Sequence, residues 1–370
     1  MSPATPAREF EHNNSFGALR LIFSCAVIIS HSAEMLDGNR TREIMHRLGS
    51  QSTLGGLAVD GFFLISGYLV AASYLKNPRL GDYFVNRVLR IYPAFIVASL
   101  ICFLLIGPLA GGDLWRLGSA DWLKAGARLI LLREPKLQGS FDALPVASLD
   151  GSMWTIAYEF RCYLLVAILG LIGVLFKRWW IFGLTVFAYG AAAYCEYRGS
   201  ALDRTVPHLL HSAIGLPSIF FPLTAFFMTG TCFRIFPEWR KARPSILVLS
   251  ALICAFAVLR FPMGDLFFGI FGGYVIFFIA VAADTKILKA INNRYDYSYG
   301  IYLYAWPIAS ILMLWAQQLN WVLMPWQLSV LTVGLSAAAG AMSWYFLERP
   351  ALRLKHGRLL ANISGQPVKA

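Results

Sequence analysis

A cation and an imidazole interrupt the first long apolar run of this sequence, Phe16 to Leu36. Arg20 lies near the start of the run and His31 near its end. Eleven residues at about 100° each make about three helical turns, so both side chains leave one face with roughly 16 Å of helix between them. A guanidinium binds anions, and an imidazole exchanges protons near neutral pH. Ionisable groups at membrane depth usually have a function, so this run is expected to carry chemistry.

Two acidic residues interrupt later apolar runs. Asp60 lies in GGLAVDGFFLISGYLV, where small residues permit close helix packing, so we expect it to face another helix rather than lipid. A cationic or imidazole partner is expected; the alternative is a carboxylate that reaches the membrane interface. Glu159 lies two residues before Arg161, and side chains two apart on a helix face different directions. Glu159 is therefore expected to find its partner on another helix.

The stretch RVLRIYP holds Arg87 and Arg90, three residues apart and so on one helical face. Guanidinium groups suit phosphate oxygens, which they bind through two parallel hydrogen bonds. Such a pair also serves as an ordinary cytoplasmic anchor of a membrane helix. We favour a phosphate site because Arg20 is predicted to lie on the same side of the membrane.

The composition identifies the elements that must position these residues. Apolar residues make up 58% of the 370, charged residues only 14%, and the mean hydropathy is +0.59. Soluble domains carry about 25% charged residues, so this is a polytopic membrane protein. Continuous apolar runs predict helices rather than a β-barrel. We predict an all-α bundle of about ten transmembrane helices, at 16–36, 54–75, 90–110, 153–176, 179–195, 216–236, 245–260, 264–283, 297–318 and 325–347.

Charge distribution predicts the orientation of the bundle. Most of the 32 Lys and Arg residues fall in segments that are cytoplasmic if the N-terminus is inside, so both termini are predicted to be cytoplasmic. The net charge of +12 is then a topological signal, and no nucleic-acid partner is expected. The predicted organisation is a lead-in at 1–15, one membrane domain at 16–355 and a cytoplasmic tail at 356–370. Pro350 is predicted to end the last helix.

The six cysteines are scattered through apolar runs without metal-binding spacing. Small buried core residues explain them better than disulfides or metal ligands. No metal site is predicted.

Six motifs in order resemble the acyltransferase-3 family of membrane O-acyltransferases. They are Arg20 with His31, GGLAVDGFFLISGYL, RVLRIYP, SLDGSMWTIAYEF, YSYGIYLYAWP and WYFLERP. Each motif is loose, but together they are specific and extend from residue 16 to about 355. The resemblance implies transfer of an acyl group, usually acetyl, from cytoplasmic acetyl-CoA to a carbohydrate hydroxyl. The implied acceptors are lipopolysaccharide, exopolysaccharide and other cell-surface or lipid-linked saccharides at the bacterial inner membrane, with polysaccharide biosynthesis machinery as a further expected partner.

The residues fit that chemistry. Arg20, Arg87 and Arg90 would supply the cationic cytoplasmic mouth that the phosphates of acetyl-CoA require. A neutral imidazole, here His31, would remove the proton from the sugar hydroxyl as it attacks the thioester. Asp60 or Glu159 would fix the imidazole tautomer and steady the imidazolium, and Asp60 is preferred. Both direct transfer and an acyl-histidine intermediate remain open.

Two departures limit what the resemblance implies. Many members have paired acids in a WSLSVEEQFY-like stretch, whereas the stretch that begins at Trp154 keeps only Glu159. Where many members have a YLYHWP-like stretch, Ala305 stands in place of the histidine, so no role passes to a histidine there. The chain resembles stand-alone members rather than those fused to a periplasmic SGNH domain.

Two other classes of protein share some of these features. A transporter or flippase of saccharide intermediates would also have ionisable residues within its helices. No convincing internal repeat relates the two halves of the sequence, and a transporter would not consume acetyl-CoA. A non-catalytic partner in a polysaccharide complex would keep surface acetylation after His31→Ala.

Overall fold

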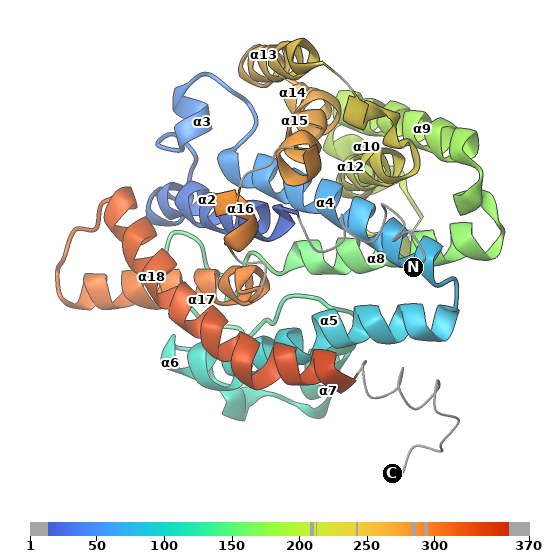
Figure 1. Cartoon of the computed structure of the whole chain (residues 1–370). Helices are drawn as coiled ribbons and strands as arrows, with labels where there is room; N and C mark the ends of the chain where they lie inside the picture. Colours follow the sequence, from blue (N-terminus) through green and yellow to red (C-terminus); the bar gives the residue numbers. More distant parts are fainter. Residues whose placement is uncertain are drawn as a thin grey trace. The chain divides into compact units, whose positions relative to one another are not determined.

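The computed structural model describes residues 14–207, 211, 213–241, 243–282, 286–291 and 295–354, and every regular element in them is helical (Figure 1). The all-α prediction is confirmed. The long helices are α2 (Phe16–Asp37), α4 (Leu54–Lys76), α5 (Leu80–Leu100), α8 (Trp154–Leu171), α9 (Arg178–Arg198), α12 (Pro217–Ile235), α13 (Pro244–Arg260), α17 (Ser298–Gln318) and α18 (Pro325–Ser343).

Shorter elements connect or extend these helices. The short α-helices are α3 (Ile44–Arg47), α6 (Gly107–Leu109), α7 (Ser119–Ile130), α10 (Ser200–Thr205), α14 (Gly264–Phe267), α15 (Gly273–Phe277) and α16 (Lys286–Ala290). The 3₁₀ turns are η2 (Leu114–Arg116), η3 (Val174–Phe176) and η4 (Pro237–Lys241). The π-helical turns are η1 (Ile101–Ile106), η5 (Phe268–Gly272), η6 (Phe278–Ala282) and η7 (Trp344–Glu348).

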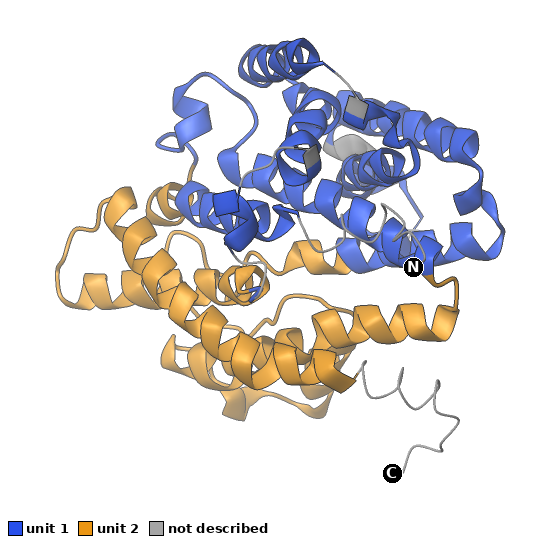
Figure 2. Cartoon of the chain, in the orientation of Figure 1, with its two compact units in different colours: residues 1–31, 40–76, 158–296 blue, residues 32–39, 77–157, 297–370 orange. Residues whose placement is uncertain are grey.

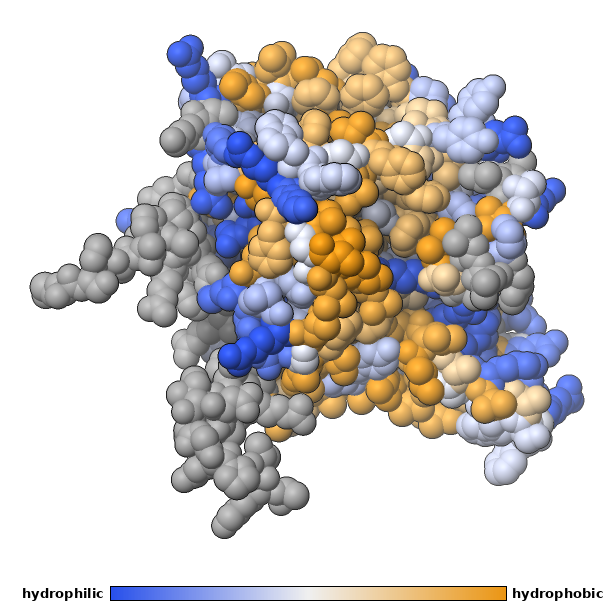
Figure 3. All heavy atoms as spheres, turned by 90° about the vertical axis from the view of Figure 1, so that its right-hand side faces the viewer, coloured by the Kyte–Doolittle hydropathy of each residue, from blue (hydrophilic) through white to orange (hydrophobic). Residues whose placement is uncertain are grey.

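Eight helical stretches in the described residues are long and apolar enough to cross a membrane, and each overlaps one predicted span. The other two predicted spans, 179–195 and 245–260, form α9 and the apolar α13. Large apolar side chains are exposed on these helices, such as Trp179 (65%), Phe187 (66%) and Leu252 (63%). Figure 3 shows apolar side chains gathered on one face of the molecule. Exposure on this scale requires lipid as the solvent, so the chain is a multi-pass membrane protein.

Two helical stretches run further than the sequence predicted. The third span starts at Leu80 instead of residue 90 and continues through η1 and α6 to Leu109. The last stretch continues to Leu354, so the predicted helix end at Pro350 is wrong. Proline lacks an N–H and its ring conflicts with the carbonyl four residues earlier. The π-helical turn η7 ends two residues before Pro350, and its wider hydrogen-bond spacing lets the helix pass that residue.

The helices group into two compact units (Figure 2). Unit 1 comprises residues 1–31, 40–76 and 158–296, and unit 2 comprises residues 32–39, 77–157 and 297–370. The predicted lead-in, except residues 14 and 15, and the predicted tail lie outside the described residues. The prediction of one membrane domain over 16–355 stays a prediction. The two units are described separately below.

Unit 1 is built on a close crossing of α4 and α12, and α9 packs on the other side of α12. A Cβ added to Gly67 would overlap the carbonyl of Phe227, and one added to Gly230 would overlap the carbonyl of Leu64. The Thr231 hydroxyl donates a hydrogen bond of 3.3 Å to the Gly67 carbonyl across the same crossing. Small residues at membrane helix crossings let backbones approach this closely.

Helices α2 and α4 of unit 1 run antiparallel. Near one end, a Cβ on Gly55 would lie 3.1 Å from Ser30. Near the other, the rings of Phe16 and Tyr68 are 5.3 Å apart between centroids. The end of α2 that carries His31 therefore lies beside the start of α4.

Unit 2 is built on the α17–α18 pair, with α5 packed against α17 and η7. A Cβ on Gly300 would lie 2.7 Å from the Cα of Gly340, so the two helices also meet at small residues. The apolar core of the unit joins α17 to η1 and to the loop that precedes α8. Its buried members are Met35, Cys102, Phe103, Ile106, Leu137, Phe141, Leu144, Leu149, Trp306, Ala309, Met313, Ala316, Leu323 and Leu328.

The α4–α12 crossing yields a stability prediction. Gly67→Ala or Gly230→Ala should lower the free energy of unfolding by about 1–3 kcal/mol, because the added methyl forces two backbones apart. The measurement is thermal unfolding of the purified protein in detergent. Gly183→Ala in α9 is the matched control, since its Cβ would meet nothing within 4 Å and alanine favours helix over glycine. Equal unfolding temperatures for all three variants would contradict the prediction.

Candidate active site

The predicted site residues fall into two groups. Arg20, His31, Asp60 and Glu159 belong to unit 1, and Arg87 and Arg90 belong to unit 2. Their catalytic and binding roles stay predictions, but the structure gives each a local environment.

Arg20 pairs with an acid that the sequence did not single out. Its Nη1 lies 2.9 Å from Oδ2 of Asp296, and both side chains are largely buried, with 25% and 14% exposed. Removing one partner of a buried ion pair leaves the other charge uncompensated, which is costly. An acid far away in sequence therefore holds the guanidinium in place.

His31 lies where three segments meet. The imidazole Nε2 would be 3.8 Å from a Cβ on Gly55, which stands at the start of α4. Next to it in α2, the Ser30 hydroxyl donates a 2.9 Å hydrogen bond to Oε1 of Glu43. Glu43 is only 1% exposed and also accepts hydrogen bonds from the backbone N–H groups of Met45, His46 and Leu54. This carboxylate therefore pins the loop between α2 and α4 beside His31.

Asp60 is buried, with 8% of its surface exposed. It lies five residues after Gly55, which is about 140° further around α4, so the two residues point to different sides. The charged and polar groups that act on Asp60's side are Asp265 and Tyr189. Within the described residues no hydrogen bond, cation or imidazole partner joins Asp60, in contrast to the expectation from sequence.

Glu159 links α8 to α4. Its Oε1 accepts hydrogen bonds of 2.7 Å from the Ser66 hydroxyl and from the Tyr163 hydroxyl. The expected partner on another helix is therefore a hydroxyl group. Ser66 lies eleven residues after Gly55, so both leave α4 on nearly the same face, with about 16 Å of helix between them.

In unit 2, Arg90 is held by a second acid that the sequence did not single out. Its Nη1 lies 3.5 Å from Oε2 of Glu348, which is 1% exposed and accepts a 3.0 Å hydrogen bond from Ser343. The guanidinium also lies over the ring of Tyr299, 5.7 Å from its centroid. A buried acid beside the Arg-Pro of WYFLERP is the sequence signal that could have revealed this pair. Breaking a buried ion pair is costly, so Arg90 has a fixed position.

Arg87 faces an aromatic ring on the same helix. Its Cζ lies 5.9 Å from the centroid of the Tyr83 ring. Arg87 and Arg90 both lie on α5, three residues apart, but different groups position them.

Two of the six motifs dock on each other within unit 2. The Tyr302 hydroxyl donates a 2.6 Å hydrogen bond to the carbonyl of Ser152 and lies 2.7 Å from Oγ1 of Thr155. The Trp306 indole N–H donates to the carbonyl of Ser148, and its ring fills the space where a side chain on Gly151 would stand. The loop before α8 is therefore fixed on α17.

This docked loop buries Asp150, which is 0% exposed. Ser152 donates to Oδ1 of Asp150 through its hydroxyl at 2.6 Å and its N–H at 2.9 Å. The other oxygen, Oδ2, is buried and has no hydrogen-bond partner in the described part of the chain. Burial raises the pKa of Asp150 to about 7, although the Ser152 hydrogen bonds oppose the rise.

Comparison with known proteins assigns the family. Residues 13–344, nearly the whole chain, match the acyltransferase domain family. The chain belongs to the acyltransferase-3 family. This acyltransferase is 26% identical over 302 residues to an O-acetyl transferase of Shigella phage Sf6. The alignment covers 81% of the chain and 86% of that protein.

Two further relatives support the assignment. Nodulation protein 10 of Rhizobium leguminosarum bv. viciae is 28% identical over 382 aligned residues, covering 95% of the chain and 97% of that protein. Acyltransferase MdmB of Streptomyces mycarofaciens is 29% identical over 160 residues, or 40% of the chain and 37% of that protein. No solved structure matches the chain. In the described part of the acyltransferase, no three His, Cys, Asp or Glu residues cluster as metal ligands.

Asp150 makes the stability of the acyltransferase depend on pH. Because its folded pKa of about 7 exceeds its ordinary value of 3.8, the folded state binds the proton more tightly than the unfolded state. Stability should therefore be highest at low pH, fall between pH 4 and 7, and level off above 7. From pH 5 to 8 the loss should be on the order of 2 kcal/mol.

The measurement is the unfolding temperature in detergent at several pH values. Asp150→Asn should flatten this pH profile, because an amide does not titrate. Asp142→Asn, at an exposed position of the same loop, should keep the wild-type profile. An unchanged profile in Asp150→Asn would show that another group causes the dependence.

Proposed function

We propose that this acyltransferase transfers an acetyl group from cytoplasmic acyl-CoA to a hydroxyl of a cell-surface or lipid-linked saccharide at the bacterial inner membrane. The relative named O-acetyl transferase supports acetyl transfer to oxygen, and the multi-pass helices support a membrane location. The observation that carries the proposal is the place of His31, an imidazole inside an apolar helix beside the start of α4, where a Cβ on Gly55 would lie 3.8 Å from its Nε2. Exopolysaccharide and lipopolysaccharide are the expected classes of acceptor, and the polysaccharide biosynthesis machinery is the expected partner.

The reaction needs one proton acceptor. His31 takes the proton of the sugar hydroxyl as the oxygen attacks the acyl carbon of the thioester. The C–S bond then breaks, and the CoA thiolate leaves and takes up a proton, so that an ester and free CoA are the products. His31 acts here as a general base, and a neutral imidazole can do so near pH 7.

The phosphates of the donor need cations in fixed positions. Arg87 and Arg90 present two guanidinium groups on one face of α5, and Glu348 and the Tyr299 ring fix the second of them. Arg20 is fixed in the same way by Asp296 in unit 1. Preorganised guanidinium groups bind phosphate with less loss of side-chain entropy.

An acid that orients His31 remains part of the proposal. Asp60 and Glu159 are the candidates from sequence. Asp60 lies on α4 itself, and Glu159 lies on α8 and contacts α4 through Ser66. Two hydroxyls donate hydrogen bonds to Glu159, whereas Asp60 has no such donor within the described residues. Glu43 acts on the same end of α2 through Ser30 and fixes the backbone around His31.

Replacing the imidazole tests the reaction. His31→Ala should lower kcat for release of free CoA from acetyl-CoA in the presence of acceptor by at least about 100-fold, as expected for loss of a general base. The unfolding temperature reports whether the variant folds. Saccharide movement without consumption of acetyl-CoA would identify a transporter instead, and normal surface acetylation with His31→Ala would identify a non-catalytic partner.

The donor site has its own test. Arg87→Ala and Arg90→Ala should each raise KM for acetyl-CoA by about 10-fold, because each loses a charge-assisted contact to phosphate, with a smaller effect on kcat. The measurement is a titration of acetyl-CoA at saturating acceptor. Arg178→Ala is the control, since its ion pair with Glu238 is exposed and weak. Unchanged KM in both α5 variants would refute the phosphate assignment.

A further inference from the structure

Two adjoining hollows lie on unit 2, and none of the residues assigned to the reaction lines either of them. The smaller, called here the apolar hollow, has a volume of about 180 Å³ and lies between α5 and α7. The larger, called the polar hollow, has a volume of about 590 Å³ and lies between α7 and the segments on either side of it. Phe103, Ala125, Arg128 and Lys136 line both of them.

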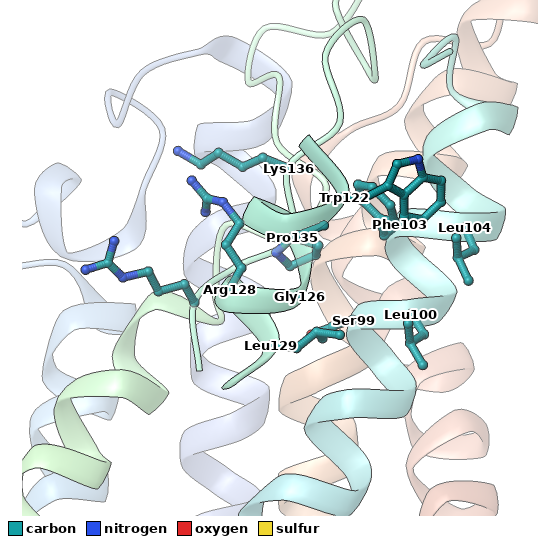
Figure 4. A pocket seen from close by; sticks show the side chains of 12 residues that line it. Ser99, Leu100, Phe103, Leu104, Trp122, Gly126, Arg128, Leu129, Pro135 and Lys136 are labelled. Carbon is teal, nitrogen blue, oxygen red and sulfur yellow. The ribbon is translucent and has the colours of Figure 1, made fainter. Parts of the chain in front are cut away.

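The apolar hollow has walls of hydrocarbon and a cationic side. Leu100, Phe103, Leu104 and Trp122 form the walls, and the Phe103 and Trp122 rings are 5.7 Å apart between centroids. In Figure 4, Arg128 and Lys136 extend to the side opposite these walls. At this volume the hollow is smaller than a drug-sized ligand site, so it suits part of one hydrocarbon chain.

The polar hollow has a different lining. Its acidic, amide and basic side chains are those that form hydrogen bonds with sugar hydroxyls. They are Asp113, Asp121, Asp142, Gln138, Arg116 and Lys124. The pairs Arg116–Asp113 and Lys124–Asp121 are exposed, so these side chains can turn to a ligand at little cost.

The wall that the two hollows share, formed by the four residues that line both, carries positive charge. Arg128 donates one hydrogen bond, from Nη1 to the Glu134 carbonyl at 2.9 Å, and a guanidinium has five donors. Lys136 makes an ion pair with Glu134 and remains 62% exposed. Arg133 lines the apolar hollow beside them. A ligand that fills both hollows would therefore place an anionic group at this wall.

We propose that the two hollows form one binding site for a saccharide linked to a lipid through phosphate. The lipid chain enters the apolar hollow, the phosphate lies between Arg128 and Lys136, and the first sugar lies in the polar hollow. This proposal rests on the proposed function, because it identifies the acceptor as lipid-linked. The amphipathic α7, with Trp122 at its start, suits the membrane interface where lipid phosphates lie.

The chain offers a substitution that fills the apolar hollow. Gly126 lines it, and a Cβ at that position would meet nothing within 4 Å. Gly126→Leu should therefore occupy the hollow while favouring helix in α7. Gly183→Leu in α9 is the matched control, a helical glycine with equally open space in unit 1.

The experiment measures binding of a short polyprenyl phosphate to the purified full-length protein in detergent by native mass spectrometry. Gly126→Leu and the double variant Arg128→Ala/Lys136→Ala should each weaken binding at least 10-fold, and Gly183→Leu should bind as the wild type does. The uncharged polyprenol should bind at least 10-fold more weakly than its phosphate. Equal binding by Gly126→Leu, or equal binding of the polyprenol, would overturn the proposal.

Two competition arms test whether the site selects a polyprenyl phosphate. If phosphatidylglycerol displaces the polyprenyl phosphate at equal concentration, the site takes bulk phospholipid and the proposal is overturned. If inorganic phosphate alone displaces the polyprenyl phosphate at low millimolar concentration, the apolar hollow is not used and the proposal also fails.

The outcomes also separate this site from the proposed function. If acetyl-CoA turnover depends on His31 while Gly126→Leu still binds polyprenyl phosphate normally, only this site is refuted. Polyprenyl phosphate binding that depends on Gly126, in a protein without acetyl transfer, would refute only the proposed function.

Discussion

A charged side chain inside an apolar bundle is costly unless other groups satisfy it, and most of the charged residues described above have such a partner. Arg20 has Asp296, Arg90 has Glu348, Glu159 has two hydroxyls and Glu43 has three backbone N–H groups and Ser30. In low dielectric an unsatisfied charge costs several kcal/mol, so a partner also holds its charged group in one position. The same contacts that make these residues tolerable in an apolar bundle therefore also hold each of them in one position.

Glycines at the helix crossings allow the close packing that brings these polar residues together. Gly67 and Gly230 let α4 and α12 meet at backbone distance, and Gly55 lets the start of α4 approach the end of α2 that carries His31. Helices in lipid gain little from burying apolar surface, so close packing and buried hydrogen bonds must hold them together. A bundle that depends on such contacts positions its polar residues accurately, because a small shift would break several contacts at once.

The sequence predicts the helices well because each span needs a continuous apolar run, which is a local property. All ten predicted spans form helices in the described residues. The same local reasoning failed at Pro350, where a π-helical turn lets the helix continue, and at the start of α5, whose first turns are polar. Partners of the charged residues were not predictable, because Asp296 and Glu348 lie far along the chain from Arg20 and Arg90. Spacing within one helix shows which side chains share a face, but not what that face meets.

The antiparallel register of α2 and α4 bears on which acid can orient His31. Gly55 lies level with Ser30, and Tyr68 lies level with Phe16, so Ser66 and its partner Glu159 lie toward the Arg20 end of α2. Asp60 is nearer to the His31 end along the axis but leaves α4 on another side. Glu43 lies at the His31 end, yet its oxygens already accept four hydrogen bonds. Glu159 therefore lies toward the end of the helix pair where Arg20 stands, whereas Asp60 lies nearer the His31 end and leaves α4 about 140° around from Gly55.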